Sequence, residues 1–245
     1  MELRFIDKSL YLPEKKILVV ADLHIGYEEG LEEQGILIPR FQFKQVVSDL
    51  ERIFRKIGRG KVKEVVILGD LKHEFSGILK QEWKETLDLL DYLESKVGRK
   101  GKIILIKGNH DTILEPLAKR KKLKVKDYYV KGDVVFLHGH KSFPKCLDKK
   151  IKTLILGHLH PAITIREGAK SEIYKCFLVG KWKGKEVVIL PSFFPLIEGQ
   201  DVGMEKTNLA SEFNFKLKNF EVYVPIDVDE VLDFGKLKKV GRLVE

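Results

Sequence analysis

Histidine occurs in only five short blocks of this 245-residue chain, and each block has the composition of a fragment of a metal site. The blocks are Asp22-Leu23-His24, Gly69-Asp70-Leu71-Lys72-His73, Gly108-Asn109-His110-Asp111, His138-Gly139-His140 and Gly157-His158-Leu159-His160. They contain all 7 histidines. Imidazole nitrogens together with carboxylate and amide oxygens form a mixed ligand set that suits manganese, iron or zinc, and no thiolate is needed.

Such a ligand set can hold two divalent ions close together, provided that one carboxylate bridges them. Two ions roughly 3.5–4 Å apart clamp a phosphate and lower the pKa of a shared water. This water attacks phosphorus in line with the leaving oxygen. The five blocks supply enough ligands for two ions and leave His110 and His140 for the substrate. We therefore expect a metal-dependent phosphoester hydrolase.

The order of the blocks, D-x-H, G-D-x-x-H, G-N-H-D, H-G-H and G-H-x-H, resembles the calcineurin-like metallophosphoesterase superfamily over residues 22–160. Three further segments resemble a narrower branch: the archaeal small phosphoesterases related to the nuclease SbcD, which are also similar to the DNA-ligase-associated phosphoesterases. These segments are residues 68–75, Lys175-Cys176-Phe177 and Pro191-Ser192-Phe193-Phe194-Pro195.

The resemblance implies a role for each residue of the blocks. One ion would be held by Asp22, His24 and His160, the other by Asn109, His138 and His158, and Asp70 would bridge them. The two divalent ions are expected to be Mn²⁺, with Fe, Zn, Ni or Co as alternatives. His110 would face the phosphate and either stabilise its developing charge or protonate the leaving group. Asp111 would hold His110 in the required tautomer.

Three residues, two of them inside the blocks, are candidate substrate contacts with open alternatives. His73 either contacts substrate or hydrogen-bonds a neighbouring carboxylate such as Glu74. His140 follows a ligand by two positions and is expected to touch the phosphate. Arg40 either reaches the site or belongs to a solvated helix face. The second alternative is favoured for Arg40, because residues 28–33 are rich in glutamate.

Five short apolar runs place the blocks on a scaffold of strands. The runs are residues 17–21, 65–68, 103–106, 134–137 and 153–156, and each ends at or just before a block. Runs of this kind are typical of strands buried on both faces. The ligands are therefore expected at the carboxyl-terminal edge of a sheet, where open α/β folds build their sites. Glycines at 69, 108, 139 and 157 would let the backbone turn sharply there.

Helical spacing over residues 41–57 and 83–97 alternates with these strands, which predicts a layered α/β fold. After residue 160 we expect a hairpin formed by residues 172–179 and 185–190 around a turn at 181–184. Residues 220–226 would add a further strand, and residues 3–6 and 10–12 would open that same second sheet. The expected architecture is a two-sheet β-sandwich flanked by helices, with four layers in the order α/β/β/α.

Length and composition fit one domain over residues 1–245, since 44% of the residues are hydrophobic. No run of eighteen apolar residues and no apolar signal segment is present. Cys146 and Cys176 show no spacing typical of a metal site or a disulfide. These features predict a cytoplasmic protein that does not associate with membranes.

The formal charge of +9 has two explanations. Basic runs at residues 119–122, 149–150 and 238–239 would attract polyanions such as nucleic acid. A thermophile-like surface with 33% charged residues explains the same balance. The second explanation is favoured, because no ladder of aromatic and basic residues is evident.

Substrate choice is the least determined property, because a two-metal clamp acts on monoesters, diesters and pyrophosphates alike. The short gaps between blocks leave no room for a large lid, and an open groove would admit polymeric substrates. We expect phosphodiester hydrolysis on nucleic acid or nucleotide-derived substrates. The alternatives are a phosphomonoesterase for small metabolites and a non-catalytic, metal-stabilised binding or scaffold protein. The last is disfavoured because every expected ligand is present. No protein partner is indicated.

Overall fold

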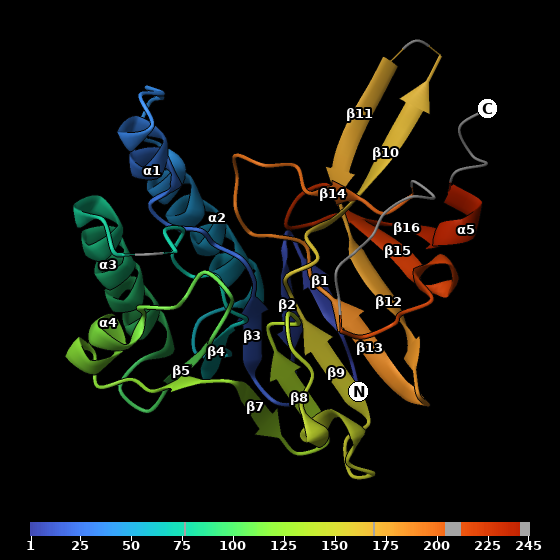
Figure 1. Cartoon of the computed structure of the whole chain (residues 1–245). Helices are drawn as coiled ribbons and strands as arrows, with labels where there is room; N and C mark the ends of the chain where they lie inside the picture. Colours follow the sequence, from blue (N-terminus) through green and yellow to red (C-terminus); the bar gives the residue numbers. More distant parts are fainter. Residues whose placement is uncertain (76, 169, 204–211, 241–245) are drawn as a thin grey trace.

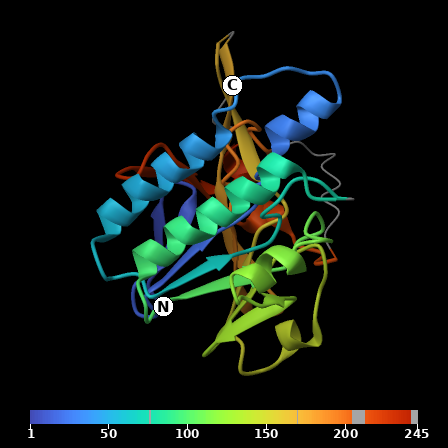
Figure 2. The same ribbon diagram turned by 90° about the vertical axis from the view of Figure 1, so that its left-hand side faces the viewer.

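Two large β-sheets stack face to face, and the longer helices cover the outer face of one of them (Figures 1 and 2). The structure is a computed structural model that describes residues 1–75, 77–168, 170–203 and 212–240. The predicted α/β sandwich is confirmed. None of the described helices is both long and apolar enough to span a bilayer.

The first sheet has six strands in sequence order. They are β1 (Arg4–Ile6), β2 (Ser9–Leu12), β3 (Ile17–Val20), β4 (Glu64–Ile67), β5 (Lys102–Ile106) and β6 (Val125–Lys126). The strands from β3 to β6 run parallel, whereas β1 and β2 form an antiparallel extension. The prediction that residues 3–12 open the second sheet was therefore wrong. Two short loops join β1, β2 and β3. Each strand therefore pairs with its neighbour in sequence, and all three lie in the first sheet.

The second sheet has seven strands in the order β16-β15-β12-β13-β9-β8-β7. Their bounds are β7 (Tyr128–Lys131), β8 (Val134–Leu137), β9 (Thr153–Leu156), β12 (Phe177–Trp182), β13 (Lys185–Ile189), β15 (Glu221–Pro225) and β16 (Val231–Lys236). The predicted strands at residues 134–137, 153–156, 185–190 and 220–226 are confirmed. The parallel core β8-β9-β13 has antiparallel strands on both sides.

A third, smaller sheet projects from the body as a long hairpin (Figure 1). It consists of β10 (Pro161–Glu167), β11 (Lys170–Lys175) and β14 (Gln200–Asp201). The single strand predicted at residues 172–179 is thus two strands, which separate at Cys176. The first part, β11, pairs with β10, and the second part, β12, joins the seven-stranded sheet.

Amphipathic helices cover the outer face of the six-stranded sheet (Figure 2). They are α1 (Tyr27–Glu33), α2 (Gln42–Ile57), α3 (Lys80–Val97) and α4 (Glu115–Arg120). In α2 the buried apolar residues are Val46, Leu50, Ile53, Phe54 and Ile57, whose spacing puts them on one face. The seven-stranded sheet has a thinner cover, made of α5 (Leu237–Val240) and the 3₁₀ turns η1 (Pro144–Leu147) and η2 (Leu217–Asn219).

Alternation along each strand divides the core into three layers. Leu18 and Val20 of β3 pack under the helices, whereas Ile17 and Val19 pack between the two sheets. Successive side chains of a strand point to opposite faces, so an unbroken apolar run is what a strand between two packed layers requires. The sandwich thus holds the ends of its parallel strands rigidly, and the histidine blocks follow those ends.

Candidate metal centre

The ligand blocks meet at the carboxyl ends of strands from both large sheets. The strands β3, β4 and β5 lead to Asp22, Asp70 and Asn109, and the strands β8 and β9 lead to His138 and His158. We predicted one sheet edge, whereas the ends of two stacked sheets contribute. Backbone hydrogen bonds join the ends across the first sheet, since the N–H of Asp22 donates to the carbonyl of Gly69 at 3.2 Å.

One set of side chains, called here the first ligand group, consists of Asp22, His24, Asp70 and His160. Their ligand atoms all lie within 4.8 Å of one another. The Nε2 atom of His160 is 3.3 Å from Oδ1 of Asp22, yet both atoms are buried and neither has a hydrogen bond with a described residue. Converging, unpaired donor atoms of this kind fit a metal ion.

The second ligand group consists of Asp70, His138 and His158, and Asn109 lies beside it. The Nε2 atom of His138 is 3.3 Å from Oδ2 of Asp70 and 3.0 Å from Oδ1 of Asn109. Asp70 is therefore common to both groups, in the position where a bridging carboxylate would lie. The structure brings all seven predicted ligand residues into this one centre.

Hydrogen bonds to the backbone orient these side chains. The Nδ1 atom of His138 lies 2.7 Å from the carbonyl oxygen of Leu68, which can only accept, so Nδ1 carries the proton and Nε2 faces Asp70. The backbone N–H of His158 donates to Oδ2 of Asp22 at 3.0 Å, and that of His110 donates to Oδ1 of Asp70 at 2.9 Å. Each carboxylate keeps its other oxygen directed at the ligand groups.

The electrostatics of the centre favour a bound cation. Burial lowers the pKa of His24 to about 3 and that of His158 to about 4, so both imidazoles are neutral, as metal ligands must be. Burial opposes protonation of His138 too, but the carboxylates of Asp70 and Asp22 raise its pKa to about 9. The two buried carboxylates thus hold positive charge near them, and a divalent ion can supply it.

The backbone at the centre adopts the left-handed conformation that side chains other than glycine rarely take. Nine such non-glycine residues occur in the described part of the chain, and five of them belong to the ligand set: Asp22, His24, Asp70, His158 and His160. Each costs roughly 1–3 kcal/mol and persists only where the surrounding structure enforces it. Backbone strain concentrated in this way is typical of functional sites.

Glycines serve two different purposes beside the ligands. Gly69 and Gly139 have φ values of +85° and +118°, so they provide the predicted sharp turns. The backbone also turns tightly at Gly157, where the N–H of Leu159 donates to the Gly157 carbonyl at 2.8 Å. Gly108 and Gly157 do not have positive φ, however, so they are not needed for a left-handed conformation. They make room instead, because a Cβ at Gly108 would lie 2.0 Å from Oδ1 of Asp70.

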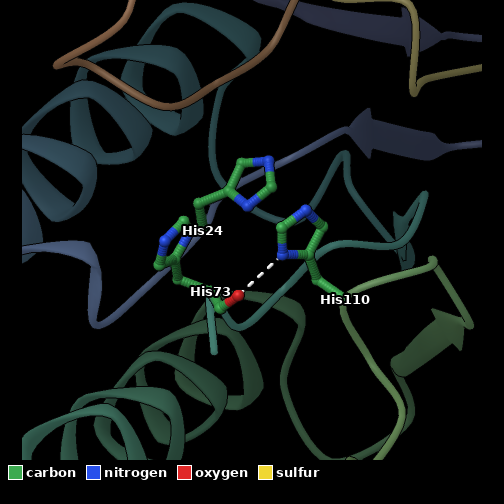
Figure 3. A group of neighbouring side chains, drawn as sticks. All are labelled: His24, His73 and His110. Carbon is green, nitrogen blue, oxygen red and sulfur yellow. Dashed lines mark hydrogen bonds between the residues drawn. The ribbon is translucent and has the colours of Figure 1, made fainter. Parts of the chain in front are cut away.

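A third set of imidazoles comes from His24, His73 and His110 (Figure 3). The ring of His73 packs against that of Tyr27 in α1. The Nδ1 atom of His110 is 2.6 Å from the carbonyl oxygen of His73 and must donate to it, so its Nε2 remains for other partners. The Nδ1 atom of His73 is buried without a hydrogen-bond partner among the described residues, and burial lowers the pKa of His73 to about 4. The ring of Phe75 packs 3.7 Å from that of His110.

Asp111 does not orient His110, contrary to the prediction from its position. Its carboxylate is buried and accepts hydrogen bonds from the backbone N–H groups of Gly108, Leu71 and Lys72. Burial, together with the negative charge of Asp70, raises the pKa of Asp111 to about 6. Asp111 therefore ties the Asn109 loop to the Asp70 loop, and the carbonyl of His73 orients the imidazole of His110.

The remaining candidate contacts lie in different surroundings. His140 packs beside the second ligand group, with its ring 5.1 Å from that of His138. Arg40 is exposed and forms an ion pair with Glu32 of α1, so it is not brought among the histidines. We favoured a solvated helix face for the glutamate-rich residues 28–33. This prediction is wrong for Glu28, which is buried and accepts hydrogen bonds from the backbone where α2 begins.

Several positioning residues could not be recognised in the sequence. Gln42 is fully buried, and its Nε2 donates to the carbonyl oxygens of Leu23 and His24. Glu82 of α3 accepts hydrogen bonds from the backbone N–H of His73 at 2.7 Å and of Glu74 at 2.9 Å. Neither residue type has a signature of its own, because a glutamine or glutamate on a helix is ordinarily solvated.

Two segments noted in the sequence, at 175–177 and 191–195, touch each other beside the first ligand group. The ammonium of Lys175 donates to the carbonyl oxygens of Ser192 and Phe194. The backbone N–H of Phe194 donates to the carbonyl oxygen of Asp22 at 3.2 Å, and its ring lies 5.7 Å from that of His24. Lys175 thus braces the loop that supports the first ligand group.

Comparison with known protein families identifies the family to which this chain belongs. The sequence matches the family of calcineurin-like phosphoesterases over residues 15–222. The chain belongs to that family. Together with the clustered ligands, membership identifies a metal-dependent hydrolase of phosphoesters that uses divalent ions. The comparisons do not separate the narrower SbcD-related branch from the rest, so that part stays a prediction. No curated protein matches the sequence.

Solved structures resemble this calcineurin-like phosphoesterase to different degrees, and the first of the following shares its fold. A nuclease MPE from Pseudomonas putida superposes with a TM-score of 0.64 at 19% identity, covering 95% of this chain and 94% of that one. A Vps29 of Entamoeba histolytica, solved with Zn²⁺, has a TM-score of 0.38 at 19% identity, covering 89% and 99%. The protein AQ665 of Aquifex aeolicus has a TM-score of 0.39 at 18% identity, covering 59% and 78%. At these identities the likeness concerns the fold alone.

Proposed function

We propose that the protein hydrolyses phosphodiesters with two divalent ions, one in each ligand group. The observation that carries this proposal is the carboxylate of Asp70, which is common to both groups. A single carboxylate between two sets of imidazoles is what a pair of ions requires and what a single ion does not.

The donor set fits Mn²⁺ or a similar divalent ion. It consists of imidazole nitrogens, carboxylate oxygens and the amide oxygen of Asn109, and Cys146 and Cys176 lie elsewhere in the core of the seven-stranded sheet. When bound, two such ions would polarise the phosphate and lower the pKa of a water between them.

Two histidines of the third set, His110 and His73, would contact the substrate. Because Nδ1 of His110 donates to the carbonyl of His73, its Nε2 can face a phosphate bound at the first ligand group. In its protonated form His110 would donate to the leaving oxygen, and in either form it would stay fixed by that bond. His73, with an unpaired Nδ1, would contact a second phosphate oxygen.

Two observations support a diester over a monoester. The chain carries a formal charge of +9, which favours polyanionic substrates over small ones. The nuclease MPE, whose fold this chain shares, is named for activity on a phosphodiester polymer. We infer a diester in nucleic acid or in a nucleotide-derived molecule as the substrate.

The test begins with protein stripped by EDTA and dialysed free of metal. We expect no hydrolysis of bis(p-nitrophenyl) phosphate until Mn²⁺ is added, and slower hydrolysis of p-nitrophenyl phosphate. Full activity in the stripped protein would refute metal dependence. Cleavage of the monoester alone would change the assignment to a small-molecule phosphatase.

A further inference from the structure

A basic groove lies on the six-stranded sheet at its β6 edge. One hollow of about 500 Å³ is bounded by the end of α3, the start of β5 and residues 122–126. A second hollow of about 440 Å³ adjoins it along α4. The two hollows adjoin at Lys122, Leu123 and Lys124, and together they are called here the basic groove.

Cations dominate the lining of the basic groove. They are Arg99, Lys102, Lys119, Lys122, Lys124 and Lys126, against the acids Glu94 and Glu115. All six cations are exposed, and none forms an ion pair with a described residue. Two nearby lysines outside the groove do form ion pairs: Lys121 pairs with Asp91, and Lys96 pairs with Glu51. The groove therefore presents unneutralised positive charge, which is available to an anionic ligand.

One end of the groove, at Lys126, lies beside the carboxyl end of β5, which leads to the metal centre. Lys126 pairs with Ile106, the last residue of β5, and the N–H of Lys107 donates to the carbonyl of Lys126 at 2.8 Å. Asn109 lies three residues beyond Ile106, which corresponds to roughly 10 Å of extended backbone. The far end of the groove, at Lys102, lies at the start of the same strand. Because residues 103–106 of β5 are buried, an extended ligand would follow the exposed β6 edge past Lys126 toward the second ligand group.

We propose that the basic groove binds the sugar-phosphate backbone of a nucleic acid strand whose scissile phosphate lies at the metal centre. This proposal rests on the phosphodiesterase function and names its substrate. A row of separated cations suits a polymer with a charge on every unit, whereas a small anion needs cations that converge on one point. The half-buried Leu123 and Val125 alternate with the exposed lysines, which keeps the cations on one side of the edge.

The structure also selects the lysines that test this proposal. Lys124 and Lys126 both line the groove and lie two residues apart on the β6 edge, so that Lys124→Glu with Lys126→Glu reverses two groove charges. The matched control is Lys238→Glu with Lys239→Glu, which changes net charge equally on exposed positions of α5, on the opposite side of the molecule (Figure 1). Thermal melting of both variants checks that they fold.

Binding is measured by fluorescence anisotropy on a labelled single strand of about 20 nucleotides, with EDTA present so that the strand is not cut. We expect the groove variant to bind about ten-fold more weakly or worse, and the control to bind within about two-fold of the wild type. The log–log salt slope of the groove variant should be smaller by about 1.4, or 0.7 for each lost phosphate contact.

Catalysis then separates this inference from the proposed function. With Mn²⁺, the groove variant should lose kcat/KM on the strand and retain hydrolysis of bis(p-nitrophenyl) phosphate. Equal binding by the groove variant and its control would refute the proposal that the basic groove binds nucleic acid, even if the small diester is cleaved. Equally tight, salt-dependent binding of dextran sulfate would also overturn it, because the groove would then lack preference for nucleic acid. Absence of small-diester hydrolysis by the wild type would count against the proposed function alone.

Discussion

The two ligand groups share Asp70 but differ in how far the protein itself satisfies their polar atoms. In the first group, Oδ1 of Asp22, Nδ1 of His24 and Nε2 of His160 are buried without hydrogen bonds to described residues. In the second group, both ring nitrogens of His138 already have partners, the carbonyl of Leu68 and the amide of Asn109. Only the first group has a second carboxylate of its own.

This difference predicts unequal affinities for two chemically similar ions. A buried, unpaired polar atom costs about 1–3 kcal/mol, and an ion in the first group would relieve several such costs. An ion in the second group must first displace the contact between His138 and Asn109, which lie 3.0 Å apart. We therefore expect the first group to bind its ion more tightly than the second.

The largest expected effect comes from removing the residue that the groups share. Asp70→Asn replaces a carboxylate by a neutral amide, which bridges two dications poorly, so both ions should be lost. Activity on a small diester should fall by more than about 10⁴-fold, because activation of water by the ions is lost. Metal content by plasma mass spectrometry and turnover are measured together. Retention of both ions by this variant would contradict the shared role.

A smaller effect is expected where both groups stay intact. His110→Ala should keep the metal content of the wild type and slow turnover by roughly 10²–10⁴-fold, the usual contribution of a general acid. The loss should shrink for a diester with a good leaving group, such as p-nitrophenol, and grow for a poor one. An equal loss on both substrates would show that His110 stabilises charge and does not donate a proton.

Gln42→Ala should affect the first group alone. Its amide holds the carbonyls of Leu23 and His24, so its removal loosens the backbone that carries the His24 ligand. Changes to residues that support metal ligands typically cost 10–100-fold in affinity. Titration with a chelator should show the tight step weakened by about that factor, with the loose step unchanged. If the loose step moves instead, the assignment of tight binding to the first group is wrong.

The scaffold of both groups was predictable because buried parallel strands leave a strong signal. The apolar runs of β3, β4, β5, β8 and β9 each lie within about a residue of the predicted bounds. Which of the two sheets each strand joins was harder to predict from the sequence. An apolar run predicts burial on two faces but not the neighbouring strand, so β1 and β2 were assigned to the wrong sheet.

The ligand residues were predictable by type and order, whereas their supports were not. The family resemblance implied that Asp111 orients His110, yet the carboxylate of Asp111 accepts hydrogen bonds from three backbone N–H groups. Glu28 of α1 belongs to an acidic run and was expected in solvent, yet it is buried and accepts hydrogen bonds from the backbone where α2 begins. Unpaired backbone N–H groups near the centre attract these carboxylates, and their positions depend on the tertiary fold.

The smallest expected effect is on the free energy of unfolding, and it comes from Lys175, which braces the loop beside the first ligand group. The ammonium of Lys175 holds the carbonyls of Ser192 and Phe194, and Phe194 in turn contacts His24. Burial, and to a lesser degree the charge of Lys8, lowers the pKa of Lys175 to about 7. In the unfolded chain the pKa of a lysine is about 10.4.

Between pH 7 and 9 the unfolded chain therefore keeps a proton on Lys175 that the folded protein partly releases. Stability rises with pH wherever the unfolded state binds more protons, so Lys175 contributes a positive slope of up to about 1.4 kcal/mol per pH unit. Lys175→Met keeps the bulk of the side chain and removes this slope. Urea unfolding of wild type and variant at several pH values measures the difference. The wild type should gain stability relative to the variant as pH rises, and parallel curves would show that Lys175 stays charged in the brace.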